Sequence, residues 1–229
     1  MSPVEKSVVF GTEDVLLGLC DSVTKVLTLA TNSHIHYSAM VQRINKTCLK
    51  PDIGCFVLFD GGFSGIVIIN FSAQAAMELY ERYMRNMGLT DGLATSFTSD
   101  EVSNVMGELM NQIVGDFTGK IGRELQTHIT QNQPKMLVIN KQVILSVDAN
   151  LDQPESRRVT LYTESNNIFY LEMAMDHTEF IKLHDFDTGE APDPDKLIAQ
   201  ANSGVKAEMP PPSPPDDSDN DELLKSLGM

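Results

Sequence analysis

Two side chains that could act together on one partner stand three residues apart in the sequence, at Glu108 and Asn111. A carboxylate can pair with a cation, and a carboxamide can accept and donate hydrogen bonds at the same time. Residues at positions i and i+3 of a helix are neighbours on its surface. If this stretch is helical, both groups are therefore presented to a single partner.

A long amphipathic helix is predicted over residues 100–125, and it carries both side chains. A turn of about 100° per residue brings Asn104, Glu108, Asn111 and Gly115 onto one face. Thr98, Ser99 or Asp100 could cap the first turn, where Asp100 and Glu101 also suit the positive end of the helix dipole. The other face is an apolar stripe made of Val102, Val105, Met106, Leu109, Met110, Ile113, Val114, Phe117 and Ile121.

The polar face is unusual because four glycines lie on or beside it, at Gly107, Gly115, Gly119 and Gly122. Each costs about 1 kcal/mol of helix stability relative to alanine. Glycine removes side-chain bulk, so Glu108 would stand above a low surface that another backbone could approach. Two alternatives remain at this point: chance glycines on a solvated helix, or glycines that admit a neighbouring element of the same chain.

The pattern Glu108-x-x-Asn111, followed after twenty-two residues by Pro134, resembles the signature of the CheC/CheX/FliY chemotaxis phosphatases. The run from Gly107 to Gly115 is most similar to CheX. The resemblance implies that this helix docks on a phosphorylated CheY-like receiver domain. Glu108 would engage the active-site lysine of the receiver, and Asn111 would orient the water that attacks the aspartyl phosphate. The family usually has Asp or Ser four residues before the glutamate, where this chain has Asn104.

Two side chains could suffice for such a reaction, since an acyl phosphate is already reactive and the receiver supplies Mg²⁺ and a lysine. What remains is to hold a water molecule in line with the phosphorus. The amide of Asn111 can accept from the water and donate to a phosphate oxygen, whereas a carboxylate there would repel the phosphoryl group. No cofactor or metal of the chain's own is expected, and CheX-like proteins suggest a possible homodimer.

Charge and composition restrict the partner. The 229 residues carry a net charge of −15. From residue 184 onward there are eleven acidic residues against three lysines, so acidic residues are in excess in both parts of the chain. Binding to nucleic acid or to an anionic membrane surface is therefore not expected, and the partner surface should be neutral or basic. Neither a signal peptide nor a long apolar span is found, which predicts a cytoplasmic protein.

The elements around the central helix predict an α+β fold in which an antiparallel sheet is packed with a few helices. Helices are expected at 13–29, capped by Thr12, and at 72–87. Residues 55–59 and 63–71 should form a hairpin around a turn at 60–62. Further strands are expected at 35–44, 142–147, 158–163 and 168–175.

Three other patterns are weaker candidates for a site. Glu164-x-x-Asn167 repeats the motif, but it lies at a strand end and no proline follows at the required distance. His34 and His36 could face one side of a strand, yet no third metal ligand is visible. The glycine-rich stretch 60–65 joins two strands and so lacks the helix start that a phosphate loop needs.

The C-terminal part of the chain divides into an acidic, proline-rich linker at 185–215 and a short amphipathic segment at 216–229. About fifteen extended residues of such a linker span about 45 Å. The last segment resembles the CheY-docking peptide of CheZ, which implies docking through Glu222, Leu223, Leu224, Leu227 and Met229. A disordered tail that only aids solubility is the alternative.

The sequence thus predicts a phosphatase domain at 1–184, a flexible linker at 185–215 and a receiver-docking helix at 216–229. A receiver-binding adaptor without catalytic activity, in a chemotaxis or two-component complex, is the rival. A domain that has kept the fold while binding something else is the third possibility.

Overall fold

The computed structural model describes residues 9–139, 141–144 and 154–182. Its centre is a seven-stranded sheet in the order β2-β9-β10-β5-β4-β6, with β7 also paired to β4. Every strand pair in it is antiparallel. The strands are β2 (His36–Ile44), β4 (Ile53–Gly61), β5 (Gly65–Phe71), β6 (Ile129–Gln131), β7 (Lys135–Val138), β9 (Glu155–Tyr162) and β10 (Ile168–Met175).

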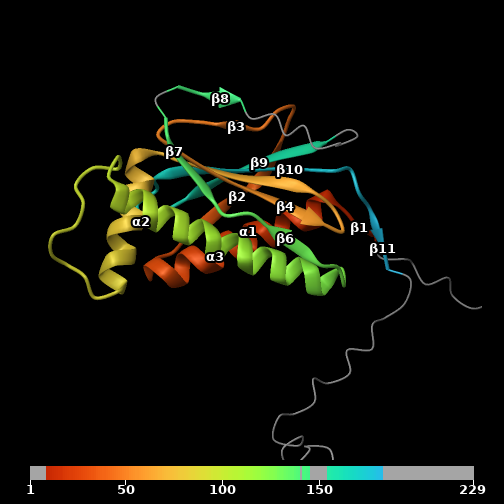
Figure 1. The fold of residues 1–229 in the computed structure, drawn as a ribbon, viewed down its shortest axis with the longest axis horizontal. Helices are drawn as coiled ribbons and strands as arrows, with labels where there is room; N and C mark the ends of the chain where they lie inside the picture. Colours follow the sequence, from red (N-terminus) through yellow and green to blue (C-terminus); the bar gives the residue numbers. More distant parts are fainter. Residues whose placement is uncertain (1–8, 140, 145–153, 183–229) are drawn as a thin grey trace, which may run out of the picture. The chain divides into compact units, whose positions relative to one another are not determined.

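Three helices cover one face of this sheet: α1 (Thr12–Thr31), α2 (Ala73–Asn86) and α3 (Asp100–Glu124) (Figure 1). On the opposite face lies a small sheet of β3 (Cys48–Leu49) and β8 (Val143–Ile144). A further pair, β1 (Val9–Phe10) and β11 (Phe180–Ile181), joins the two ends of the described part of the chain. The predicted α+β class with an antiparallel sheet is confirmed.

The main core lies between the sheet and the three helices. β5 is buried along its whole length, as expected for a central strand whose neighbours β4 and β10 are both long. Its Val67 and Ile69 face the helices, whereas Ile66 and Ile68 pack with Leu49 of β3 in a smaller cluster on the other side. Both faces of the strand are thus covered, which explains its unbroken run of β-branched residues.

The predicted elements agree with the structure except at several ends. Thr12 is the first residue of α1 and not its cap; Gly11 is the cap, and its amide donates to the side chain of Asp14 at 2.9 Å. The predicted hairpin of β4 and β5 is present, but β4 continues through Gly61, so the turn comes later than expected. Residues 145–147 of the strand predicted at 142–147 lie outside the described residues, and β8 occupies 143–144.

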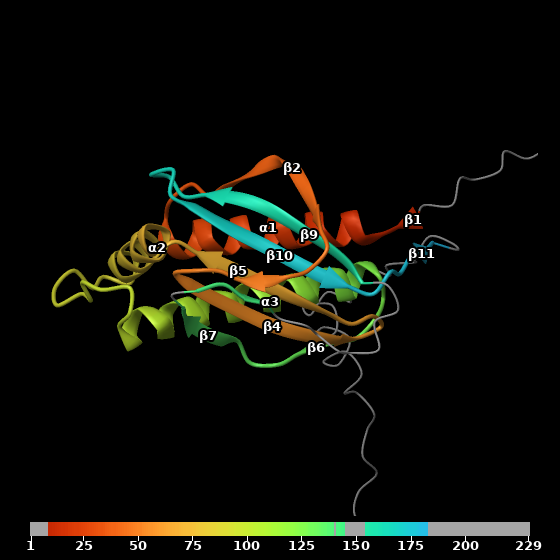
Figure 2. The same ribbon diagram turned by 90° about the horizontal axis from the view of Figure 1, so that it is seen from above.

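Several short strands were not predicted from the sequence, and two of them, β6 and β7, lie next to α3. Both pair with β4, at opposite ends of that strand, and they occupy the sheet edge nearest to α3 (Figure 2). The linker at 185–215 and the docking segment at 216–229, with Glu222, Leu223, Leu224, Leu227 and Met229, fall outside the described residues. The division of the chain at residue 184 therefore stays a prediction.

Candidate functional site

The start of α3 is held in place by local capping and by a buried tyrosine. Ser99 accepts a hydrogen bond from the amide of Val102 at 3.2 Å, as an N-cap residue should. The hydroxyl of Tyr80, from α2, bonds to the carboxylate of Glu101 and accepts from the amide of Ala94 at 3.0 Å. These contacts tie the irregular connection between α2 and α3 to both helices and so fix where α3 begins.

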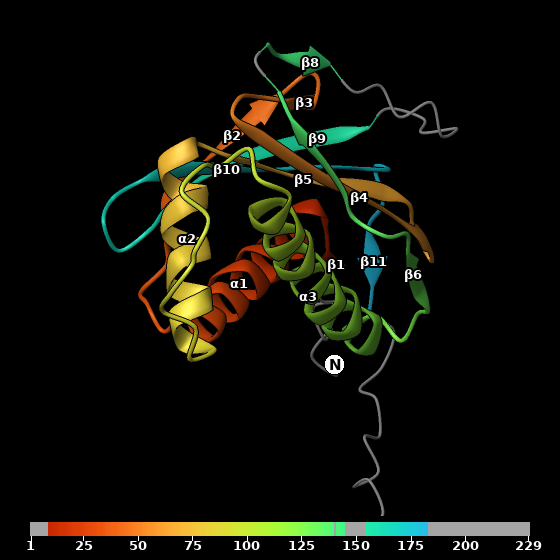
Figure 3. The same ribbon diagram turned by 60° about the vertical axis from the view of Figure 1, so that its left-hand side comes forward.

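The two faces of α3 are separated as the sequence predicted. Of the nine residues in the apolar stripe, only Val105 is partly exposed, and the other eight are buried in the main core. The exposed side carries Asn104, Glu108, Asn111, Gln112 and Gly115, which we call the α3 ridge. Figure 3 shows α3 in front of α1, with β6 beside it. The ridge is therefore open to a partner.

Glu108 is the isolated charge of the α3 ridge. Gln112, one turn later, donates a hydrogen bond from Nε2 to Glu108 Oε1 at 2.9 Å. Glu108 has no cationic partner among the described residues. A surface carboxylate without a cationic partner can still pair with a lysine of an approaching protein.

On the flank of α3 that faces α1, by contrast, opposite charges are paired. Lys25 lies 2.5 Å from Asp116, and Lys120 lies 3.1 Å from Asp21. Desolvation raises the pKa of Asp116, but hydrogen bonding, chiefly from Lys25, together with the charges of Lys25 and Lys120 outweighs it, so the pKa lies below its usual value. These pairs join α1 to α3 and leave Glu108 as the charge that a partner on the ridge would meet.

Asn111 makes a contact that sequence reasoning missed. Its Oδ1 accepts a hydrogen bond from Nε2 of Gln131, the last residue of β6, at 3.3 Å. Gln131 is only partly exposed, and its Oε1 is buried with no hydrogen-bond partner among the described residues. β6 is three residues long and has no strong alternation, so no pattern in the sequence placed this glutamine beside the motif.

Three of the four glycines of the helix show how different their surroundings are. A Cβ added at Gly115 would meet no heavy atom within 4 Å, so this position is an open low point of the ridge. At Gly122 it would lie 2.9 Å from the carbonyl oxygen of Thr127, and at Gly107 3.6 Å from Cγ of Met136 in β7. The second alternative, a neighbouring element of the same chain, is therefore correct for Gly122. Gly107 also faces its own chain, so Gly115 is the stronger candidate for partner contact.

Pro134 lies in the short connection between β6 and β7. Proline has no amide hydrogen to donate, so it interrupts a strand ladder. Its position separates the strand that carries Gln131 from the strand that faces Gly107. The proline of the sequence motif is thus part of the segment that returns along α3.

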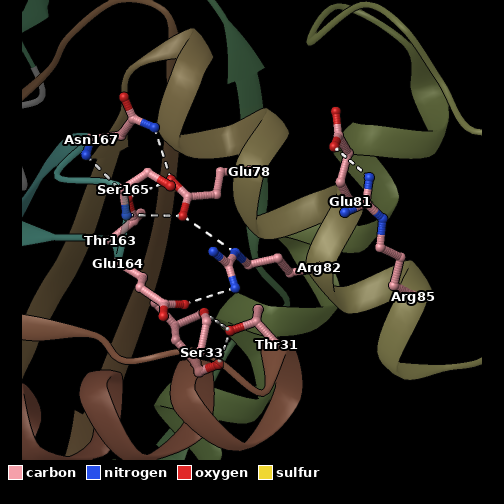
Figure 4. A network of polar contacts seen from close by, with 11 residues as sticks. Thr31, Ser33, Glu78, Glu81, Arg82, Arg85, Thr163, Glu164, Ser165 and Asn167 are labelled. Carbon is pink, nitrogen blue, oxygen red and sulfur yellow. Dashed lines mark hydrogen bonds and ion pairs between the residues drawn. The ribbon is translucent and has the colours of Figure 1, made fainter.

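The second tetrad, Glu164 to Asn167, serves a structural network at the turn between β9 and β10 (Figure 4). Glu164 pairs with Arg82 at 2.8 Å, and Asn167 donates to Glu78 at 2.8 Å. Glu78 also accepts from the hydroxyl of Thr163. The carboxylate of Glu164 is thus already neutralised by an arginine of its own chain, and Asn167 is engaged by Glu78, in contrast to the pair on α3, where Glu108 has no cationic partner among the described residues.

This network borders a cleft of 790 Å³, lined by Thr31, Asn32, Gln74, Met77, Glu78, Glu81, Arg82, Arg85, Asn86, Ser165 and Asn167. Both arginines are already paired within the chain, Arg82 with Glu78 and Glu164 and Arg85 with Glu81. Desolvation raises the pKa of Glu78, but hydrogen bonds from Thr163, Asn167 and Ser165 outweigh it and lower the pKa below its usual value. Among the described residues that line it, the cleft thus offers no unpaired cation for an anionic ligand.

The remaining weak candidates have local partners. The rings of His34 and His36 stack with centroids 5.5 Å apart, and His36 stacks in turn on Tyr162 at 5.2 Å. Within the described ranges no three His, Cys, Asp or Glu side chains are grouped as a metal site would need. In the glycine-rich turn, Ser64 donates to the carboxylate of Asp60, so that hydroxyl is engaged within the turn.

Residues 6–229 match the model of a protein family described as "Protein of unknown function (DUF3334)". The chain belongs to this family. No curated protein matches it. Solved structures of CheX and CheC-like proteins share its fold. The CheX chemotaxis protein of Desulfovibrio desulfuricans is 14% identical, with a TM-score of 0.59 over 71% of this chain and 99% of that one.

A CheC-like superfamily protein of Shewanella sp. PV-4 has the same TM-score, 0.59, at 15% identity over 71% of this chain and 97% of that one. The CheX of Borrelia burgdorferi, solved as a CheX–CheY–BeF₃–Mg²⁺ complex, gives a TM-score of 0.50 at 15% identity over 72% and 99%. The resemblance stated from the Glu108/Asn111 motif is thus confirmed as a shared fold. No helix in the described part of the chain is long and apolar enough to cross a membrane.

Proposed function

We propose that this DUF3334 protein is a phosphatase that hydrolyses the aspartyl phosphate of a CheY-like receiver domain. The observation that carries the proposal is the pair Glu108 and Asn111, exposed side by side on α3 of a CheX-like fold. A CheX with this fold has been captured with CheY, BeF₃ and Mg²⁺. The motif and the fold are separate reasons for the same assignment.

In the proposed reaction the receiver docks with its phosphorylated edge on the α3 ridge. Glu108 pairs with the active-site lysine of the receiver. Asn111 accepts a hydrogen bond from a water molecule and holds it in line with the phosphorus–oxygen bond of the acyl phosphate. The receiver's own Mg²⁺ and lysine stabilise the charge on the phosphoryl group, so the chain contributes orientation rather than acid–base chemistry.

The surface of α3 suits such a partner. Glu108 lacks a cation of its own among the described residues, while the flanking charges of α1 and α3 neutralise one another. Gly115 leaves space one turn from Asn111, so a receiver backbone could come close to the amide. Asn104, one turn before Glu108, can donate or accept a hydrogen bond at the rim of the same contact.

We also propose that residues 216–229 recruit the receiver. Glu222 and the apolar residues Leu223, Leu224, Leu227 and Met229 would form a short helix on it, in the helix-in-groove mode. A short helix of this kind is marginal by itself in water, so it would fold on its partner. Tethering through the linker at 185–215 would raise the receiver concentration at α3 to the order of mM.

The deciding experiment follows the loss of phosphate from a receiver that has been phosphorylated with a small phosphodonor. The wild-type chain should accelerate this loss. Asn111→Ala should abolish the acceleration while binding persists, and Glu108→Ala should weaken binding. Asn45→Ala, an exposed asparagine next to β2 at the other edge of the sheet, is the matched control and should act like the wild type.

The same measurement separates the phosphatase from a receiver-binding adaptor. An adaptor would bind the phosphorylated receiver through the α3 ridge and leave its rate of dephosphorylation unchanged. The feature that favours this alternative is Asn104, because the family usually has Asp or Ser at this position. If Asn104→Asp creates an acceleration that the wild type lacks, the chain is an adaptor derived from a phosphatase.

A further inference from the structure

β6 is a short strand, but its backbone is held on β4 by three hydrogen bonds, one made by Thr130 and two by Asn132. The hydroxyl of Thr130 donates to the carbonyl oxygen of Asp60 at 3.0 Å. Asn132 accepts from the amide of Leu58 through its side chain at 3.0 Å and donates its own amide to the Leu58 carbonyl at 3.1 Å. The side chain between these anchors, that of Gln131, therefore projects from a well-defined point toward α3.

A close backbone contact supports the same strand just before it begins, at His128. The amide of Gly62 donates to the carbonyl oxygen of His128 at 3.3 Å. A Cβ at Gly61 would lie only 2.0 Å from that oxygen, so only glycine permits the approach of the two segments. The close contact at Gly61 and Gly62 thus sets the position of β6, and through it the position of Gln131 relative to α3.

The Gln131 amide points its donor at Asn111 and its carbonyl end into the protein. Nε2 donates to Asn111 Oδ1 at 3.3 Å, and Oε1 is buried with no hydrogen-bond partner among the described residues. Buried carbonyl oxygens are left without partners more often in proteins than buried amide donors are. The observed arrangement is thus the less costly way to leave one end of a buried amide unpaired.

This donor in turn decides what Asn111 presents to a partner. Because Oδ1 faces Gln131, the Nδ2 group of Asn111 keeps both hydrogens for the solvent side. Oδ1 retains its second lone pair, since a carbonyl oxygen can accept two hydrogen bonds. An amide held in this way can still accept from a water and donate to a phosphate oxygen.

We propose that Gln131 is a positioning residue that holds the carboxamide of Asn111 in this orientation. The catalytic consequence rests on the proposed phosphatase function, whereas the restraint of the amide does not. Gln131 reaches Asn111 from a different element, so it acts through that side chain without itself meeting the phosphoryl group.

The kinetic test uses the full chain with Gln131→Met, which keeps the length of the side chain and removes its donor. The kcat for dephosphorylation of the receiver should fall roughly 2- to 10-fold, the range expected for one lost neutral hydrogen bond, with KM unchanged. The kcat of Gln131→Glu should be lower still, because a carboxylate at this position attracts Nδ2 of Asn111 and adds negative charge near the phosphate. Gln74→Met, at an exposed position of α2, is the control.

The restraint itself is measured by NMR on the ¹⁵N-labelled chain. The side-chain amide signal of Asn111 is assigned from its loss in Asn111→Ala, and its heteronuclear NOE reports its mobility. The NOE should be high in the wild type and Gln74→Met, and low in Gln131→Met with unchanged backbone signals. Equal mobility in the wild type and Gln131→Met would overturn the proposal.

The two measurements distinguish failure of this inference from failure of the proposed function. An active wild type whose kcat is unaffected by Gln131→Met overturns the positioning role in catalysis. A wild type that never accelerates dephosphorylation counts against the phosphatase. In that case the NMR comparison still decides whether Gln131 restrains Asn111. Greater mobility of the Asn111 amide in Gln131→Met than in the wild type supports the restraint, and equal mobility refutes it.

Discussion

Gly115 is the position at which stability and function should respond in opposite directions. It lies inside α3, and a Cβ added there would meet no heavy atom within 4 Å. Gly115→Ala should therefore keep the fold and remove the conformational cost of glycine in a helix, about 1 kcal/mol. For a chain of this size, that gain corresponds to a rise in Tm of about 2–4 °C. If α3 served only to cover the sheet, this substitution would raise stability with no loss of function.

If the receiver docks on the α3 ridge, bulk added at position 115 should weaken binding of the receiver. Gly115→Gln places a long, uncharged side chain where the receiver backbone should approach Asn111. Extra atoms in a packed contact cost about 1–3 kcal/mol, which corresponds to roughly 5- to 150-fold weaker binding. Alanine adds a single methyl group and should lie between glycine and glutamine. Glutamine is still a good helix former, so the variant should be at least as stable as the wild type.

The assay measures Tm by circular dichroism and binding by titration with a CheY-like receiver that carries beryllofluoride and Mg²⁺ in place of the phosphoryl group. Gly115→Ala is the matched control, since it strengthens the helix with the least added bulk. The expected result is a Tm that does not fall while affinity decreases in the order Gly, Ala, Gln. If Gly115→Gln binds the receiver as tightly as the wild type does, the ridge is not the docking surface.

Three further changes test other parts of the structure. Gly122→Ala should lower the Tm, in contrast to Gly115→Ala, because its Cβ would come within 2.9 Å of the backbone oxygen of Thr127; thermal melts of the two variants give the comparison. The pKa of Glu78 is lower in the folded protein than in the unfolded chain. Its ionised form therefore stabilises the fold at pH values above the unfolded pKa, and this stabilisation is lost as the pH falls through the folded pKa. Glu78→Gln should therefore be less stable at pH 7 and show a flatter decline in urea midpoints below about pH 4.3, the ordinary glutamate value; parallel curves would refute this. Deletion of residues 216–229 should raise KM for the phosphorylated receiver and leave kcat unchanged, and an unchanged KM would exclude the tether.

The part of the site that lies on one helix could be predicted from the sequence. Helical periodicity is a local property, so the apolar stripe of α3 fixed which residues are buried and which are exposed. Glu108 and Asn111 consequently appear on the open face, as their spacing required. β10 was predicted at its observed limits, Ile168–Met175, since a mostly apolar strand between turn residues gives an equally local signal.

The part of the site contributed by other elements could not be predicted in the same way. β6 has three residues and owes its position to β4, through the carbonyl of Asp60 and the backbone of Leu58. A pattern of three residues carries no period, so neither the strand nor the contact of Gln131 with Asn111 could be inferred. The glycines show the same limit, since Gly115 and Gly122 look alike in the sequence and differ only in what lies opposite them.

The spacing of the motif nevertheless contains tertiary information. From Asn111 to the end of α3 at Glu124 the chain advances thirteen residues, or about 20 Å at 1.5 Å per residue. Leu125 and Gln126 form the turn after the helix, with Gln126 at a φ of 49°. From Thr127 to Gln131 the chain then advances four residues, about 13 Å at 3.3 Å per residue if extended. The return therefore needs fewer residues than the helix did, and it ends with Gln131 hydrogen-bonded to Asn111. Pro134 follows three residues later, in the connection between β6 and β7, so the separation between the asparagine and the proline covers the end of α3 and this return. Insertion of one residue between Gln126 and Thr127, with β6 kept in register on β4, should leave this contact intact, whereas a shift of β6 by one residue would turn Gln131 to the other face of the strand.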